Sequence, residues 1–208
     1  MKKLIILYFL FITTGVAAQT NPQLSKLIDS LYEVDQAVQW KILSLNEQGA
    51  PQDSIQKQQG VSKDTYIRHL EIIKGIYAQY GYPTTKMVGE EVSHEFFVLI
   101  QHADSDPQFQ ATMLPVIGRL SRKGKVAKKD YAYLYDRVQR NTGGKQRYGT
   151  QPSWKKGNLF DENNRIIYPT DLEDPQNVDK RRKKMGLEPL EQYYETVLQT
   201  LGRPRKKP

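Results

Sequence analysis

Apolar residues recur every three or four positions along most of the chain, which is the spacing of one buried face of an α-helix. The first stripe follows Asn21-Pro22, a pair that favours a helix start because asparagine caps the first turn and proline fits the first helical position. We expect this helix to end near Gly49. Its apolar stripe consists of Leu24, Leu27, Ile28, Leu31, Val34, Val38, Ile42 and Leu45.

Two more helices are expected in the first half of the chain. A Gln-rich connector, residues 52–60, precedes a helix whose inner face includes Ile67 and which Gly81 ends as a left-handed cap. The next helix, about residues 88–103, is the most apolar one, so it is predicted to be central. On its edge Glu91, Glu95 and His102 lie side by side when 100° separates successive residues.

Proline and glycine mark the remaining helices. Pro107 opens a fourth helix, in which Pro115 is expected to cause a kink or a split, and Gly143 ends a fifth. Pro175 and Pro189 each open a short C-terminal helix.

Between the fifth helix and the C-terminal ones the period changes from about four to two, which is typical of extended chain. The apolar pairs around 161–164 suggest a hairpin with a four-residue turn. The sequence therefore predicts a mainly α domain of about six to seven helices with a small β-hairpin near residues 146–168.

The N-terminus has the three parts of a secretory signal peptide. Lys2 and Lys3 precede an apolar run at 4–12, and the small residues Val16 and Ala18 precede the expected cleavage site. We expect residues 1–18 to be removed and the protein to be exported, to the periplasm or the medium, with no membrane span after cleavage.

Composition narrows the function classes. The chain has 208 residues, 31 Lys and Arg against 23 Asp and Glu, and no Cys, which excludes disulfides, thiol catalysis and thiolate metal sites. One domain is expected over residues 19–202, followed by a disordered basic tail at 203–208. The basic runs at 119–129 and 180–184 could bind anionic polymers, but they lack interleaved aromatic residues, which argues against nucleic-acid recognition.

Four polar strings beside the most apolar helix predict the lining of a site. They are Gln101-His102-Ala103-Asp104, Asp136-Arg137, Gln146-Arg147-Tyr148 and Tyr148-Gly149-Thr150-Gln151.

These strings occur in one order with three others, Gly81-Tyr82-Pro83, Asp179-x-Arg181-Arg182 and Gly186-Leu187-x-Pro189-Leu190. Together they resemble the bacterial family catalogued as domain of unknown function 6624, from about residue 79 to residue 194. The resemblance implies that the strings form one site, and it assigns no activity.

His102 is the main catalytic candidate, because imidazole titrates near neutral pH and a carboxylate could orient it. The candidate partners are Glu95, Asp104 and Asp136. The alternative is a partly buried histidine that holds a helix end through hydrogen bonds. Asp136 with Arg137 could orient His102 or anchor an anion, or form a structural pair instead.

The other site residues predict binding. Amide and hydroxyl groups from an extended segment suit a sugar or a peptide, and they equally suit a buried turn that satisfies its own backbone. A tryptophan could stack on a ligand. The predicted ligand-binding residues are Gln101, Arg137, Gln146, Tyr148, Thr150, Gln151 and Trp154.

No metal site or cofactor is expected. His94 and His102 lie about 12 Å apart along one helix, too far to chelate one ion. Val98 stands where a zinc-protease motif starting at His94 needs its second histidine.

Two functions fit these observations. The first is a ligand-binding or interaction domain for a sugar, peptide or anionic polymer of the cell envelope, with its polar site around the QHAD and YGTQ strings. The alternative is an envelope hydrolase or lyase with His102 as general acid or base. The first is preferred because the sequence shows no evident nucleophile.

Overall fold

A computed structural model describes residues 21–153, 155 and 158–203. The predicted signal peptide at 1–18, Trp154 and all of the basic tail except Arg203 lie outside these residues. Eight α-helices and one short 3-10 helix make up the regular structure of the described part, which confirms the predicted mainly α fold. None of these helices is long and apolar enough to cross a membrane.

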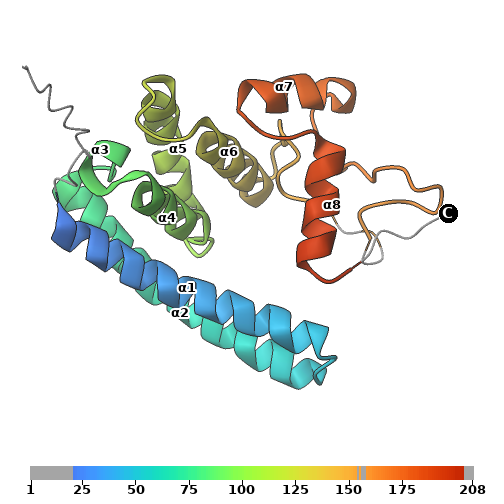
Figure 1. Ribbon diagram of the computed structural model, residues 1–208, viewed down its shortest axis with the longest axis horizontal. Coiled ribbons are helices and arrows are strands. Elements are labelled where there is room, and N and C mark those ends of the chain that lie inside the picture. Colours follow the sequence, from blue (N-terminus) through green and yellow to red (C-terminus); the bar gives the residue numbers. More distant parts are fainter. Residues whose placement is uncertain (1–20, 154, 156–157, 204–208) are drawn as a thin grey trace, which may run out of the picture.

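Two long helices form an antiparallel hairpin along one side of the molecule (Figure 1). They are α1 (Pro22–Glu47) and α2 (Gln52–Tyr80). The side chain of Asn21 accepts a hydrogen bond from the backbone N–H of Leu24 at 3.0 Å, which confirms the predicted cap. The predicted connector at 52–60 is the first part of α2, because its glutamines are good helix formers and only Pro51, just outside, interrupts the pattern.

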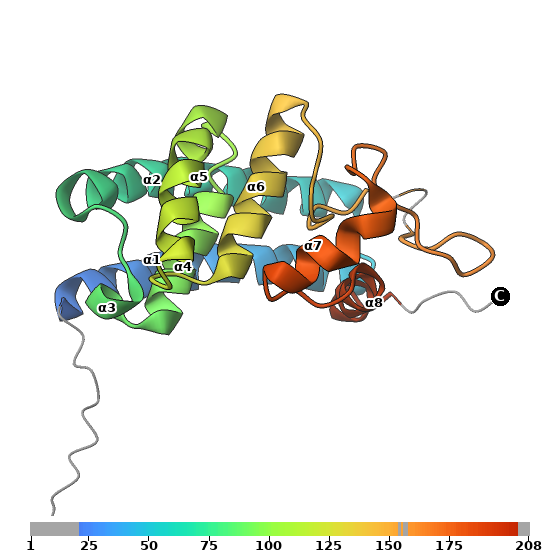
Figure 2. The ribbon, with the colours of Figure 1, turned by 90° about the horizontal axis from the view of Figure 1, so that it is seen from above.

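Four helices lie over this hairpin, and α5 and α6 run across it (Figure 2). They are α3 (Thr85–Val88), α4 (Glu90–Gln101), α5 (Pro107–Arg122) and α6 (Lys128–Thr142). The predicted third helix is shorter than expected because Gly89, with φ of 91°, separates α3 from α4. The predicted split at Pro115 is absent, since α5 continues through this residue as one helix.

The C-terminal elements are the 3-10 helix Pro175–Asn177, α7 (Val178–Lys184) and α8 (Leu190–Thr200). The predicted hairpin is reduced to one antiparallel bridge, Phe160 with Ile166, around a turn. Gln146 forms a parallel bridge with Leu172 instead of pairing within the hairpin. The period of two at 146–151 therefore marks a buried irregular segment, and the described residues contain no extended strand.

Two hydrophobic cores hold these elements. The first lies among α1 to α6, with Ile28, Phe96 and Ile117 completely buried. The second lies around α7, α8 and the chain between α6 and α7. It comprises Leu159, Phe160, Leu172, Val178, Leu190, Tyr194 and Leu198.

The buried face of α1 changes character halfway along the helix. Leu24, Ile28 and Leu31 are buried, whereas Leu27 and Val34, which the apolar stripe included, are 40% and 49% exposed. Asp35 takes the next position of the buried face, four residues after Leu31, and no residue of α1 beyond it is buried. The contact of α1 with the first core thus ends at Asp35. The candidate site lies at this end of the core.

Candidate functional site

His102 is held at the C-terminal end of α4. Its backbone N–H donates to the carbonyl of Val98 at 3.0 Å. The fully buried amide of Gln110 donates to the carbonyls of Ile100 and Gln101 at 3.2 and 3.0 Å, so the free carbonyls of the helix end are satisfied from α5. The backbone that carries the imidazole is therefore fixed from two helices.

The imidazole of His102 pairs with Asp35 of α1. Nδ1 lies 2.9 and 2.8 Å from the two carboxylate oxygens, and Asp35 is completely buried. An ionised carboxylate can only accept, so Nδ1 is assigned the proton and Nε2 keeps a free electron pair. The predicted partners, Glu95, Asp104 and Asp136, do not contact the ring, so the predicted partner is corrected to Asp35. The signal for Asp35 was a carboxylate in the buried stripe of α1.

A pocket of about 490 Å³ opens beside this pair, within the size range of small-molecule sites. The ring of Tyr66 lies 5.0 Å from the ring of His102, and the Gln39 amide donates to the Tyr66 hydroxyl. Burial, and then the charge of Asp35, raise the pKa of Tyr66, so its hydroxyl stays neutral. The pocket is lined by Ile42, Gln59, Ser62, Lys63, Tyr66, His102, Asp104 and Ser105.

Asp104 lines the same pocket and forms an ion pair away from His102. Arg137 donates to it through Nε at 2.9 Å and Nη2 at 2.6 Å, and Asn141 donates at 2.9 Å. Burial raises the pKa of Asp104, but Arg137 and these hydrogen bonds outweigh burial and leave the pKa below its usual value. Asp104 is therefore ionised and fixes Arg137. Its catalytic role stays a prediction.

Asp136 is fully buried and anchors the segment after α6. Its carboxylate accepts the backbone N–H groups of Arg147, Tyr148 and Thr150 at 2.8, 3.2 and 2.9 Å, and the Thr150 hydroxyl at 2.9 Å. Burial raises the pKa of Asp136 above its usual value, although these hydrogen bonds oppose the shift. These contacts favour the structural alternative for Asp136.

The residues of the Q-x-YGTQ string form the same anchored segment. Gln146 exchanges hydrogen bonds with the backbone of Gln151, whose side-chain oxygen accepts from Arg137 Nη1 at 2.8 Å. Gly149 has φ of +66°, and a Cβ there would come within 3.1 Å of Leu190. Gln146, Tyr148, Thr150 and Gln151 are all buried.

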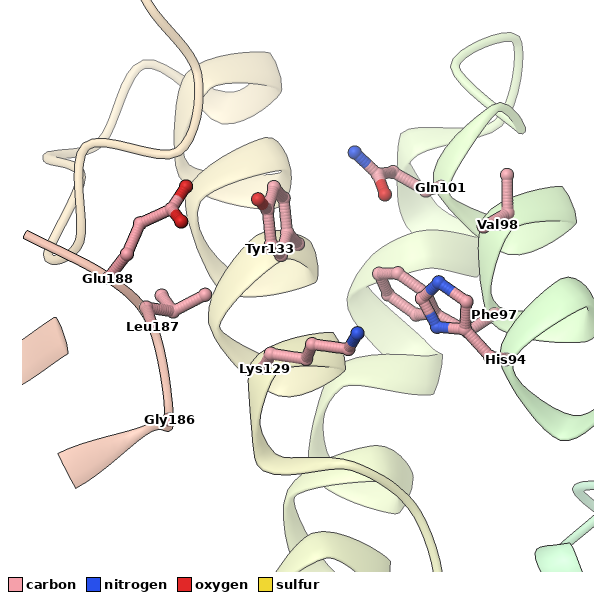
Figure 3. Close-up of a pocket in the computed structure, with 9 residues that line it drawn as sticks. All are labelled: His94, Phe97, Val98, Gln101, Lys129, Tyr133, Gly186, Leu187 and Glu188. Carbon is pink, nitrogen blue, oxygen red and sulfur yellow. The ribbon is translucent and has the colours of Figure 1, made fainter. Parts of the chain in front are cut away.

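The absence of a side chain at Gly149 thus makes room for Leu190 of the second core. The contacts favour a turn that satisfies its own backbone, and ligand binding by these residues stays a prediction. One residue of the QHAD string, Gln101, lines a different cleft on the α6 side of α4 (Figure 3). Trp154 lies outside the described residues.

Several groups of this network were missed by the sequence analysis: Asp35, Tyr66, Gln110 and Asn141. Asp35, Tyr66 and Gln110 belong to α1, α2 and α5. These helices pack against α4 or α6 only in the folded protein, so their contacts cannot be read from local sequence. In the part of the chain that the structure describes, no three His, Asp or Glu residues are grouped to hold a metal ion.

A family model described as "Family of unknown function (DUF6624)" matches residues 22–204. The match confirms the resemblance found in the motifs and extends it to α1, which carries Asp35. Comparison with curated proteins and with solved structures finds no significant match to this chain.

Proposed function

The chain belongs to the DUF6624 family, which is described without a function; we propose from the site's geometry that its pocket beside His102 binds a polar ligand and that His102 acts there as general acid or base. The reaction class is hydrolysis or elimination. The observation that carries this proposal is the contact of His102 Nδ1 with the wholly buried Asp35 at 2.8 Å.

Asp35 gives His102 a defined chemical state. With the proton on Nδ1, the free electron pair of Nε2 can take a proton from water or from a ligand hydroxyl. The positive charge that then forms on the ring lies against the Asp35 carboxylate, in a place from which water is excluded, so the interaction is little screened. Asp35 is thus a positioning residue and His102 the group that meets the ligand.

The surface of the pocket is mainly apolar and carries a few hydrogen-bonding groups. Gln59 and Ser105 offer neutral donors and acceptors, whereas Ser62 is buried and bonds to Tyr66. This lining suits a ligand that has hydroxyl or amide groups on a largely apolar body. Sugars and peptides have this chemistry. Because the sequence predicts export, we propose that the ligand is a sugar or a peptide of the cell envelope, met in the periplasm or the medium.

A second candidate is a binding domain without chemistry. It is supported by the lining, whose apolar surface and few hydrogen-bonding groups can hold a ligand without a reaction. It is also supported by the contacts of His102, whose ring pairs with Asp35 and, among the described residues, with no serine hydroxyl. In this case His102 contributes a hydrogen bond to the ligand and no proton transfer.

Turnover and binding measured on one set of variants separate the two candidates. The probes are 4-nitrophenyl glycosides and a muropeptide mixture, assayed with the full mature chain. For an enzyme, His102→Asn lowers turnover by about 10²- to 10⁴-fold, as expected for loss of an acid–base group, while calorimetric affinity changes little. Asp35→Asn is expected to lower turnover as well, because it leaves the ring without its carboxylate.

Urea unfolding and circular dichroism of each variant show whether a loss of turnover reflects a loss of fold. Turnover that survives His102→Asn would overturn the acid–base assignment. Binding of a muropeptide without turnover, lost in His102→Asn, would support the binding domain. Direct evidence on the tautomer comes from the ¹⁵N shifts of the His102 ring, where a protonated Nε2 and a bare Nδ1 would contradict the proposal.

A further inference from the structure

A second cleft, of about 390 Å³, lies between α4 and α6 and shares no lining residue with the His102 pocket. Figure 3 shows its lining. Its walls are α4, α6 and the connection between α7 and α8. The lining residues are His94, Phe97, Val98, Gln101, Lys129, Tyr133, Gly186, Leu187 and Glu188. Apart from Gln101, none of them belongs to the site predicted from the sequence.

Two opposite charges face this cleft without pairing. Lys129 comes from the first turn of α6, and Glu188 from the connection before α8. The ion pairs and hydrogen bonds found among the described residues include neither side chain. In Figure 3 the two charged groups lie on different sides of Tyr133, so each is available to a ligand group of opposite sign.

Neutral polar groups and an aromatic face complete the cleft. The Gln101 amide lies on the other side of Tyr133 from Glu188 (Figure 3). The Tyr133 hydroxyl points toward the Glu188 side in the same view, and it is hydrogen-bonded to Tyr193. The ring of His94 stacks on the buried Phe97 at 5.6 Å with an interplanar angle of 24°, and the Asp130 carboxylate lies 2.9 Å from its Nδ1. The face of the His94 ring can contact a hydrocarbon group, and the Gln101 amide suits a peptide bond.

The backbone that carries both charged side chains is set by the fold before a ligand arrives. Arg182, which is completely buried, donates from Nε to the backbone carbonyl of Glu188 at 2.7 Å. The next residue but one, Leu190, is tied to the Asp179 carboxylate through its backbone N–H at 2.8 Å. Lys129 stands on a regular helix. A ligand therefore has little backbone ordering to bring about on binding, which favours affinity.

We propose that this cleft binds a zwitterion, an amino acid or a short peptide that presents both a carboxylate and an ammonium group. Lys129 receives the carboxylate and Glu188 the ammonium group, and Gln101 binds an intervening amide. A simple anion would meet the repulsion of Glu188, and a simple cation that of Lys129. The two unlike charges thus select a ligand that has both.

Calorimetry with the full chain and four small probes tests this pairing. The probes are alanyl-alanine, alanine, N-acetylalanine, which lacks the ammonium group, and alaninamide, which lacks the carboxylate. We expect alanyl-alanine to bind tightest and each singly charged probe to bind at least about tenfold more weakly, since each loses one charge-assisted contact.

Variants assign each charge to its partner. Lys129→Met should weaken alanyl-alanine binding at least about tenfold and strengthen the weak binding of alaninamide, because the repulsion of that cation by Lys129 is removed. Glu188→Gln should weaken alanyl-alanine binding to the same degree and strengthen the binding of N-acetylalanine, the anion. Lys128→Met is the matched control, because Lys128 is an equally exposed neighbour that does not line the cleft. It should bind alanyl-alanine like the unaltered chain. Circular dichroism confirms that each variant is folded.

Three results would overturn the proposal. One is no heat of binding for alanyl-alanine up to about 10 mM, a level that would reveal even weak millimolar affinity. Another is N-acetylalanine that binds as tightly as alanyl-alanine, which would mean a plain anion site. The third is an equal loss of affinity in Lys128→Met and Lys129→Met, which would mean attraction by net charge alone.

Discussion

Helix α4 carries two histidines, and each contacts a buried aspartate of another helix through Nδ1. His102 pairs with Asp35 of α1 at 2.8 Å, and His94 pairs with Asp130 of α6 at 2.9 Å. The two distances are almost equal, but the settings differ. The His102 side chain is 19% exposed, at a pocket beside Tyr66, while the His94 side chain is 41% exposed and stacks on Phe97.

The comparison shows that a short histidine–aspartate contact does not by itself identify an acid–base residue. Both aspartates are buried, so the difference lies on the imidazole side. Where water has little access to the ring, the attraction between ring and carboxylate is screened less, and proton transfer to a ligand is better controlled. His102 meets this condition more closely, which is why we propose that it, and not His94, acts on a ligand.

The largest expected difference between the two pairs is in stability. His102→Ala leaves the wholly buried Asp35 carboxylate without its main partner, and we expect it to cost about 3 kcal/mol, because a buried charged group that loses its hydrogen-bond donor costs more than a neutral one. His94→Ala should cost only about 1 kcal/mol, because the exposed ring makes room for water at Asp130. Urea unfolding at pH 7 measures both.

A double variant shows where this loss comes from. If the stranded carboxylate causes it, the His102→Ala and Asp35→Ala changes together should give a protein more stable than His102→Ala alone. A double variant that is less stable than either single variant would mean that the packing of the two side chains, and not their charge, provides the stabilisation at this site. Equal losses for His94→Ala and His102→Ala would remove the distinction drawn between the two pairs.

The backbone next to His102, at the end of α4, is held by Gln110 of α5, whereas His94 lies within the helix. The Gln110 amide donates to two carbonyls at the end of α4 and to Asp104, and its oxygen accepts from Asn141 at 3.0 Å. Gln110→Leu keeps the volume and removes these bonds. We expect a loss of about 2 kcal/mol, the cost of leaving buried carbonyls unpaired.

Nuclear magnetic resonance tests whether the effect of Gln110→Leu is confined to the surroundings of His102. The ring signals of His102 should shift or broaden in Gln110→Leu, while those of His94, in the body of α4, should stay in place. Gln108→Leu, on the exposed face of the same helix, is the matched control and should change neither stability nor the His102 signals. Unaltered His102 signals in Gln110→Leu would show that Asp35 alone holds the ring.

Helix boundaries could be predicted from the sequence more accurately than the burial of individual side chains. Helix boundaries came from local chemistry, as at Asn21, where the capping bond is present, and at Gly143, which ends α6 in the left-handed conformation. The mainly α fold followed from the same local rules. Which residues of a stripe face the core was less predictable. Leu27 and Val34 are exposed because α2, α3 and α4, the helices that pack on α1 in the described part of the chain, leave these two positions uncovered.

The site was harder to predict for a different physical reason. Asp35 and His102 are 67 residues apart, and only the packing of α1 on α4 brings them together. The Q-x-YGTQ string shares one hydrogen-bond network with Asp104, Arg137 and Asp136, and its polar groups bond within the protein. A buried turn and a ligand site need the same amides and hydroxyls, so sequence alone leaves both open.

The smallest expected effect comes from Glu95, which lies between the two histidines on α4. Burial, together with Asp29 of α1 and Glu91, raises its pKa to about 7, and His94 opposes the shift. Tyr32 of α1 also lies near this carboxyl group. The folded protein therefore binds a proton on Glu95 that the unfolded chain releases near its ordinary value.

This difference gives a defined pH dependence. The stability contributed by the proton is complete below the unfolded pKa, about 4.3, and is lost as pH rises through about 7. Glu95→Gln keeps the shape without the charge, so its stability relative to the unaltered chain should increase over this window and level off above it. We expect a gain of about 1 kcal/mol at pH 8, because the side chain is only partly buried and solvent screens it.

The measurement is urea unfolding from pH 4 to pH 8 for the unaltered chain, Glu95→Gln and the control Glu90→Gln, which alters an exposed carboxylate on the same helix that is not among the groups that shift the pKa of Glu95. The control should follow the unaltered chain closely. In a His94→Asn background the Glu95 transition should move to higher pH, since the opposing imidazole is gone, whereas a change at the more distant His102 should move it less. A Glu95→Gln curve parallel to that of the unaltered chain would contradict the raised pKa. It would also show that the part of α4 around His94 is open to water, as the exposure of the His94 ring suggests.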